Sequence, residues 1–161
     1  MDGQVLPLPP GTPAPEFTLP RTSHSAVSLA DFRGRRVVLV FHPADWEPVS
    51  TQQLTLYQDN LAEFHRLGAV LLAVSPDQIW CHEAFARDTG IRYPLLSDAH
   101  PQAAVSRAFG VTGAQQESSC RALFVIDGEG VIRWSQTYPA AMNPGVGSIL
   151  AALESMDREE A

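Results

Sequence analysis

The run RVVLVF at residues 36–41 contains no small or turn-forming residue, and four of its six positions are β-branched or aromatic. A short, continuous apolar run of this kind predicts a strand covered on both faces, as in the interior of an α/β sheet. A second run, AVLLAVS at residues 69–75, and a third, ALFVID at residues 122–127, have the same character. The sequence therefore predicts a central sheet built around these three strands.

The segments between these runs predict helices and one hairpin. Apolar residues three or four apart predict a helix over residues 48–67, and further helices are expected over residues 76–89, 100–109 and from Met142 or Pro144 to Met156. Residues 93–96 are a short strand candidate. Residues 131–136 follow residues 122–127 across a Gly-Glu-Gly turn, which predicts a hairpin.

This order predicts an α/β fold, a thioredoxin-like three-layer sandwich with a central mixed sheet and helices on both faces. We expect one domain over residues 1–161. Residues 1–16 form an extended Pro-rich arm, because proline fixes φ and removes a backbone donor. Residues 16–19 and 27–29 are a candidate pair of short strands.

Composition excludes several classes of function. The net charge is −7, and all 11 basic residues are arginine. An acidic chain with scattered arginine predicts no nucleic-acid or membrane partner, and the absence of lysine excludes Schiff-base chemistry. No apolar run is long enough to span a bilayer, no secretory signal is visible, and there are only two cysteines. We therefore expect a cytoplasmic protein.

The loop after the first strand is where an open α/β sheet places its site. It reads HPADWEPVSTQQ at residues 42–53, and Pro48 suits the first position of a helix. A thiol at position 50 would lie in the first turn, where free N–H groups lower its pKa. The sequence has Ser50 there, and the alternative interpretation is that Ser50 and Gln53 form a capping box at the helix start.

Four segments in the right order resemble the peroxiredoxins, the alkyl hydroperoxide reductase and thiol-specific antioxidant family. They are GTPAPEF at residues 11–17, the strand with its loop at residues 37–50, YPLLSD at residues 93–98 and RALFVID at residues 121–127. The resemblance implies a thiol-dependent peroxidase for hydrogen peroxide or organic hydroperoxides, with no cofactor, a thioredoxin-like reductant and a monomer or homodimer. It also implies that position 50 carries the nucleophile, that Pro43 shields it, and that Arg121 stabilises the thiolate and orients the peroxide.

Two residues depart from the family pattern. Ser50 replaces the peroxidatic cysteine, and a hydroxyl has neither the ionisation nor the sulfenic acid state that the reaction needs, so the chain with Ser50 is expected to be inactive. An engineered Cys-to-Ser substitution is favoured as the smallest isosteric change, and the alternative is a naturally inactive thioredoxin-fold binding module with native Ser50. Glu47 stands where the family has a hydroxyl, and it either pairs with Arg121 or another arginine or points to solvent.

The remaining candidates are cysteines and histidines. Cys81, on the helix at residues 76–89, matches the approximate place of a resolving cysteine in some peroxiredoxins, and its alternative is a packed small hydrophobe. Cys120 is expected to be an ordinary residue at a strand edge. The five histidines show no ligand spacing, so no metal is expected.

Overall fold

The computed structural model of the chain describes residues 6–112 and 120–160. Its main sheet has five strands in the order β5-β4-β3-β6-β7. These are β3 (Arg36–Phe41), β4 (Ala69–Ser75), β5 (Leu95–Ser97), β6 (Arg121–Ile126) and β7 (Ile132–Tyr138). The pairs β3–β4 and β4–β5 are parallel, whereas β3–β6 and β6–β7 are antiparallel. The predicted mixed sheet is confirmed, and its three central strands are the three apolar runs.

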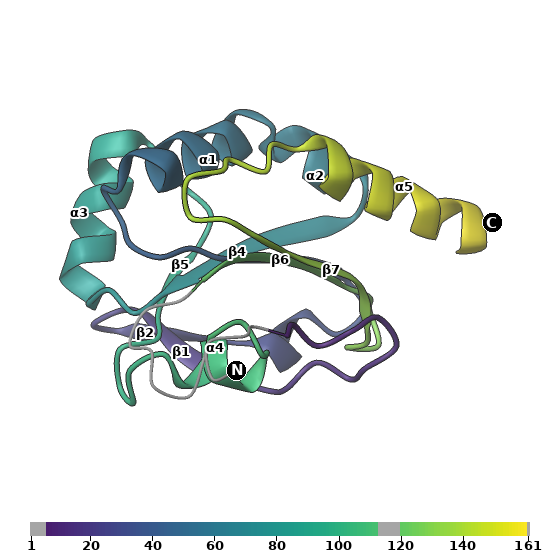
Figure 1. Cartoon of the computed structure of the whole chain (residues 1–161), viewed down its shortest axis with the longest axis horizontal. Coiled ribbons are helices and arrows are strands. Elements are labelled where there is room, and N and C mark those ends of the chain that lie inside the picture. The colour runs from purple at the N-terminus through teal and green to yellow at the C-terminus, as the bar shows by residue number, and fades with distance from the viewer. Residues whose placement is uncertain (1–5, 113–119, 161) are drawn as a thin grey trace.

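Two layers cover the sheet (Figure 1). One face carries α1 (Pro48–Asp59), α2 (Leu61–Arg66), α3 (Ile79–Thr89) and α5 (Gly147–Glu160), which bury an apolar cluster that includes Leu54, Phe64, Phe85 and Leu153. The other face carries the hairpin of β1 (Thr18–Thr22) and β2 (Ser25–Ser28), the short helices η1 (Leu29–Phe32) and α4 (Ala104–Ala108), and a second cluster around Phe17 and Phe109. The α/β thioredoxin-like fold is thus as expected.

Element boundaries differ from the sequence predictions in several places. The helix predicted over residues 48–67 is interrupted at Asn60, whose backbone leaves the helical conformation between α1 and α2 (φ −106°, ψ 14°) and whose side chain donates to the Leu56 carbonyl. Residues 76–78 precede α3 and are not helical, and α5 begins only at Gly147 and extends to Glu160. The bounds of α4, β5, β7 and the β1–β2 strand pair also differ from the predictions by a few residues.

The N-terminal arm is held along the sheet edge. Gly11 donates to the Ile132 carbonyl, and Ile132 donates to the Thr12 carbonyl. Proline has no backbone N–H, so the donors of the arm are non-proline residues such as Leu8, Gly11 and Ala14. No helix within the described residues is long and apolar enough to cross a membrane.

Candidate active site

The sheet brings Ser50 and Arg121 together from distant parts of the chain. Ser50 lies in the first turn of α1, directly after the loop that follows β3, and is fully buried. Arg121 begins β6, which pairs antiparallel with β3 so that Ala122 faces Phe41. The Arg121 Nη1 donates to Ser50 Oγ at 3.1 Å. The register of two apolar strands therefore places the cation beside the helix start.

Glu47 caps α1 and faces the same site. Its carboxylate accepts hydrogen bonds from the backbone N–H of Val49 at 2.8 Å and of Ser50 at 2.9 Å. The Ser50 hydroxyl donates to Glu47 Oε1 at 2.8 Å, and Arg121 Nη2 donates to that oxygen at 2.9 Å. Partial burial opposes the charged form, but these hydrogen bonds lower the pKa of Glu47 to about 2. Of the alternatives for Glu47, the pairing with Arg121 is the one observed.

Arg121 has no N–H group left for another ligand. The residue is 1% exposed, and a guanidinium carries five N–H donors. Nε and Nη2 donate to the Ala140 carbonyl, and Nη1 donates to Gln53 Oε1 at 2.7 Å. With the contacts to Ser50 and Glu47, these account for all five donors. The charge of the site is therefore balanced by the protein's own carboxylate.

The structure changes the interpretation of two residues at the helix start, Ser50 and Gln53. Ser50 is the third residue of α1 and not its cap, so the capping-box alternative is wrong because the Glu47 side chain takes the N–H groups first. Gln53, which the sequence offered only as part of that box, instead accepts from Arg121 and donates to the Tyr57 hydroxyl. Pro43 is half-buried in the loop before α1. Its shielding role stays a prediction.

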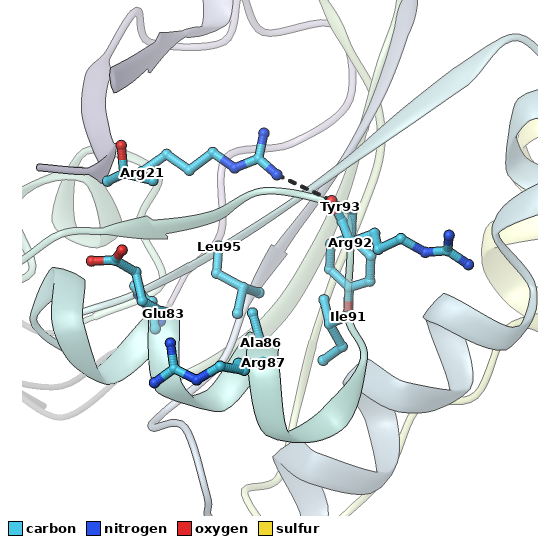
Figure 2. Close-up of a pocket in the computed structure, with 10 residues that line it drawn as sticks. Arg21, Glu83, Ala86, Arg87, Ile91, Arg92, Tyr93 and Leu95 are labelled. Carbon is cyan, nitrogen blue, oxygen red and sulfur yellow. Dashed lines mark hydrogen bonds between the residues drawn. The ribbon is translucent and has the colours of Figure 1, made fainter. Parts of the chain in front are cut away.

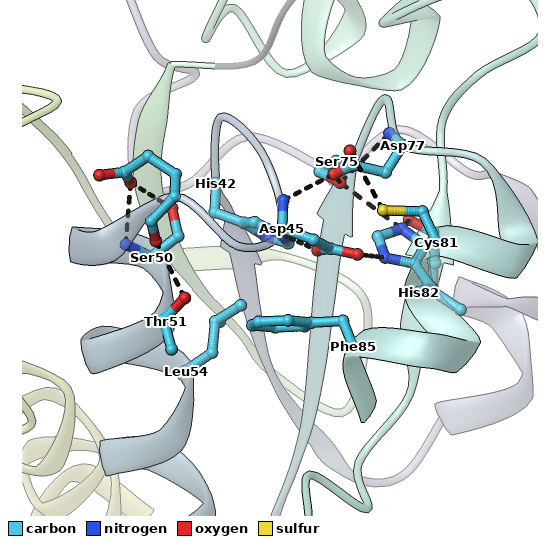
Figure 3. Close-up of polar contacts among 12 residues, drawn as sticks. His42, Asp45, Ser50, Thr51, Leu54, Ser75, Asp77, Cys81, His82 and Phe85 are labelled. Carbon is cyan, nitrogen blue, oxygen red and sulfur yellow. Dashed lines mark hydrogen bonds and ion pairs between the residues drawn. The ribbon is translucent and has the colours of Figure 1, made fainter. Parts of the chain in front are cut away.

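A second polar cluster, absent from the sequence predictions, lies beside the first (Figure 3). The buried Asp45 carboxylate accepts from His42 Nε2 at 2.9 Å and from His82 Nδ1 at 2.5 Å. His82 Nε2 faces the Leu96 carbonyl at 3.0 Å, so both of its ring nitrogens face oxygen atoms that can accept a hydrogen bond. Burial opposes ionisation of Asp45, but the two histidines hold its pKa well below the usual range.

The histidines show no ligand spacing in the sequence, but the fold brings one of them beside two carboxylates; the expectation of no metal stays a prediction. Single ligand atoms of His42, Asp45 and Asp77 lie within 4.8 Å of one another. The residues come from the loop after β3 and the turn after β4, so the three ligand atoms are not grouped in one stretch of sequence. Their oxygens are already engaged: Asp77 Oδ2 accepts from the Asp45 backbone N–H and from the Ser75 hydroxyl.

The two cysteines are both partly buried and lie in different surroundings. Cys81 lies on α3 with its sulfur 3.8 Å from Asp77 Oδ1. Burial, together with the nearby charges of Asp77 and Asp45, raises the pKa of Cys81 to about 11. In Figure 3, Cys81 and Ser50 lie at opposite ends of the cluster, with His42 and Asp45 between them. Cys120 directly precedes β6, as expected, and burial raises its pKa.

Comparisons with known proteins agree with the fold and the site. The family model described as the AhpC/TSA family matches residues 10–135. A putative peroxiredoxin of Mycobacterium tuberculosis is 40% identical over 131 residues, which are 78% of this chain and 82% of that protein.

Two solved structures are also similar. The reduced 2-Cys peroxiredoxin of Plasmodium vivax has a TM-score of 0.87 and 26% identity, and the match covers 96% of this chain and 84% of that one. The peroxidoxin BcpB of M. tuberculosis has a TM-score of 0.82 and 27% identity, with 92% and 98% covered. The chain belongs to the AhpC/TSA family, the peroxiredoxins, a family of thiol-dependent peroxidases.

Proposed function

We propose that this chain, with Ser50, is a non-catalytic member of the peroxiredoxin family whose peroxide site is filled by its own Glu47 carboxylate. In the family reaction a thiolate attacks one peroxide oxygen, the O–O bond breaks, and the sulfur is oxidised to a sulfenic acid while the peroxide leaves as an alcohol or water. A serine hydroxyl is neither ionised at neutral pH nor able to reach that oxidation state. Peroxide reduction at position 50 is therefore excluded by chemistry.

The observation that carries the proposal is the set of contacts of Glu47. The donors that surround position 50 are the Ser50 backbone N–H and the guanidinium of Arg121, and both already serve this carboxylate. A peroxide or a thiolate at this place would find each of them engaged. Glu47 supplies the negative charge that a buried arginine requires.

The same contacts favour a native Ser50 over an engineered one. The Ser50 hydroxyl donates to Glu47 Oε1 at 2.8 Å. A cysteine there would place its sulfur beside a carboxylate, which opposes thiolate formation and raises the thiol pKa. Because Glu47 suits a hydroxyl donor and opposes a thiolate, the two departures from the family pattern fit together as a pair.

The second candidate function is the thiol peroxidase itself, with cysteine at position 50. It is supported by the burial of residue 50 in the first turn of α1 and by its 3.1 Å contact with Arg121. In this candidate Cys81 resolves the sulfenic acid as a disulfide, and an external dithiol such as thioredoxin in the cytoplasm reduces it. Because Cys81 and position 50 lie at opposite ends of the cluster in Figure 3, local unfolding is needed to bring their sulfur atoms together before that bond forms.

Peroxide consumption with excess dithiothreitol separates the two functions. The proteins are the unaltered chain, Ser50→Cys, and the double variant Glu47→Thr/Ser50→Cys. We expect no turnover from the unaltered chain, slow turnover from Ser50→Cys, and turnover at least about tenfold faster from the double variant, the factor for about one pKa unit.

Each contrary result has a clear meaning. Turnover by the unaltered chain overturns the non-catalytic proposal. Full activity of Ser50→Cys with Glu47 in place shows that the carboxylate does not close the site and supports the peroxidase with an engineered serine. Circular dichroism of all three proteins establishes that they fold alike.

A further inference from the structure

A cavity of about 550 Å³ lies between the β1–β2 hairpin, α3 and the segment that leads into β5 (Figure 2). Its volume is within the range of small-molecule sites. Glu47, Ser50 and Arg121 are not among the residues that line it. The two sites share only the neighbourhood of His82, which borders the cavity and binds Asp45 on its other side.

The floor of the cavity offers carbon and no free polar atom. Ile91, Tyr93 and Leu95 form it, and all three are at most 5% exposed. The Tyr93 hydroxyl donates to the Leu54 carbonyl at 2.7 Å, and both ring nitrogens of His82 contact other acceptors. The part of a ligand that rests on this floor is therefore apolar, because a polar group there would lose its bonds to water without replacement.

The rim of the cavity is cationic. Arg21, Arg87 and Arg92 line it, against a single acidic residue, Glu83. Within residues 6–112 and 120–160, none of these three arginines lies within 4.0 Å of a carboxylate, whereas five other arginines do. Three uncompensated guanidinium groups at one cavity are unexpected in a chain of net charge −7. They create a local positive potential that attracts an anion.

Two of these arginines are placed for a ligand head group. Figure 2 shows Arg21 and Arg87 on opposite sides of Leu95 and Ala86, while the Arg92 side chain extends away from Leu95. Arg21 Nη2 donates to the Arg92 carbonyl at 3.1 Å, which fixes its guanidinium at the edge of the cavity and leaves other N–H donors for an anion. A planar guanidinium binds a carboxylate through two parallel hydrogen bonds.

We infer that this cavity binds a small organic carboxylate with an apolar body. The body rests on Ile91, Tyr93 and Leu95, and the carboxylate binds Arg21 or Arg87. Both parts are required, because the floor rejects polar groups and the rim carries three arginines against one carboxylate. The inference does not depend on the function proposed for Ser50.

Titration calorimetry and amide chemical shifts test it on the full chain. The probe is octanoate, and its two controls are octanol, which lacks the charge, and acetate, which lacks the body. We expect octanoate to bind with shifts concentrated at residues 82–95, and both controls to bind at least about tenfold more weakly, the factor for a charge-assisted hydrogen bond or about two buried methylene groups.

Arginine variants locate the head group. The double variant Arg21→Gln/Arg87→Gln is expected to weaken octanoate binding at least about tenfold. The matched control Arg158→Gln, at an exposed position on α5, is expected to change nothing. Both side chains of the double variant are exposed, and the two single variants provide the same test if the double variant does not fold.

Three results would overturn the inference. They are the absence of octanoate binding at millimolar concentration, binding that the double variant leaves unchanged, and octanol or acetate binding as tightly as octanoate.

Discussion

Asp45 and Glu47 are two carboxylates on one short loop, and the protein balances their charges in different ways. Glu47 faces a permanently charged guanidinium and the N-terminus of α1. Asp45 is more deeply buried and faces two imidazoles, which carry a proton only under some conditions. The comparison shows that one short loop holds an ion pair with Arg121 at the helix start and a buried carboxylate–histidine network behind it.

The largest expected effect is at Asp45. Asp45→Asn removes the buried carboxylate that contacts both His42 Nε2 and His82 Nδ1, and breaking such a buried network from one side costs about 3 kcal/mol. Urea denaturation is expected to report this loss, together with a fall in Tm of roughly 6–12 °C for a chain of this size. The matched control Asp88→Asn, at an exposed site on α3, is expected to stay within about 0.5 kcal/mol. An Asp45→Asn protein as stable as the parent would mean that the contacts of the Asp45 carboxylate with the two histidines do not stabilise the fold.

A smaller loss is expected at Glu47. Glu47→Gln removes the carboxylate from Arg121 but keeps an oxygen that can cap α1. The Glu47 side chain is 33% exposed, so solvent screens part of the interaction, and we expect a cost of about 2 kcal/mol. The exposed Glu129→Gln serves as control in the same urea titration. If Glu47→Gln were neutral, Arg121 would not depend on this carboxylate.

The reactivity of Cys81 tests the negative potential around Asp77. The pKa of Cys81 is raised to about 11 by burial and by the nearby carboxylates, so little thiolate exists at pH 8. Asp77→Asn removes one of these charges and is expected to accelerate alkylation of Cys81 about tenfold, one pKa unit. Mass spectrometry of the alkylated peptides measures the rate, with Cys120 as the internal reference. An unchanged Cys81 rate would show that burial alone protects this thiol.

The smallest expected effect is the pH dependence of the contribution that Glu47 makes to stability. The pKa of Glu47 is about 2 in the folded chain against 4.5 when unperturbed, so its contribution is complete above pH 4.5 and is lost as pH falls toward 2. The stability difference between the parent and Glu47→Gln should therefore shrink by roughly 1 kcal/mol across this interval, after allowance for screening. A difference that stays constant from pH 5 to pH 2.5 would assign the Glu47 effect to packing.

The sequence predicted the sheet and the meeting of Ser50 with Arg121, but it did not predict the polar network. Continuous apolar runs identify buried strands, and family resemblance points to Pro43, Ser50 and Arg121. The role of Gln53 depends on which side of α1 faces Arg121, and the contacts of Asp45 depend on the packing of α3 against the loop after β3. Such long-range contacts between polar side chains produce no periodic pattern in the sequence.

Helix boundaries were missed for a local reason. The break between α1 and α2 lies at Asn60, where φ is −106° and ψ is 14° and the side chain donates to the Leu56 carbonyl. Apolar spacing continues across it, so periodicity alone predicts one uninterrupted helix. Asparagine side chains can compete with the backbone hydrogen bonds of a helix. They form the same kind of bond in turns and caps, so an asparagine in the sequence does not by itself identify a helix break.

The most direct test of the Glu47 account is the thiol pKa at position 50. It is measured from the pH dependence of alkylation in Ser50→Cys and in Glu47→Thr/Ser50→Cys, with the modified residue located by mass spectrometry. The account predicts a pKa above the ordinary value of about 8.5 while Glu47 is present, and a value at least about one unit lower once Glu47 is replaced. A thiol at position 50 that is already ionised at pH 7 beside an intact Glu47 would contradict it.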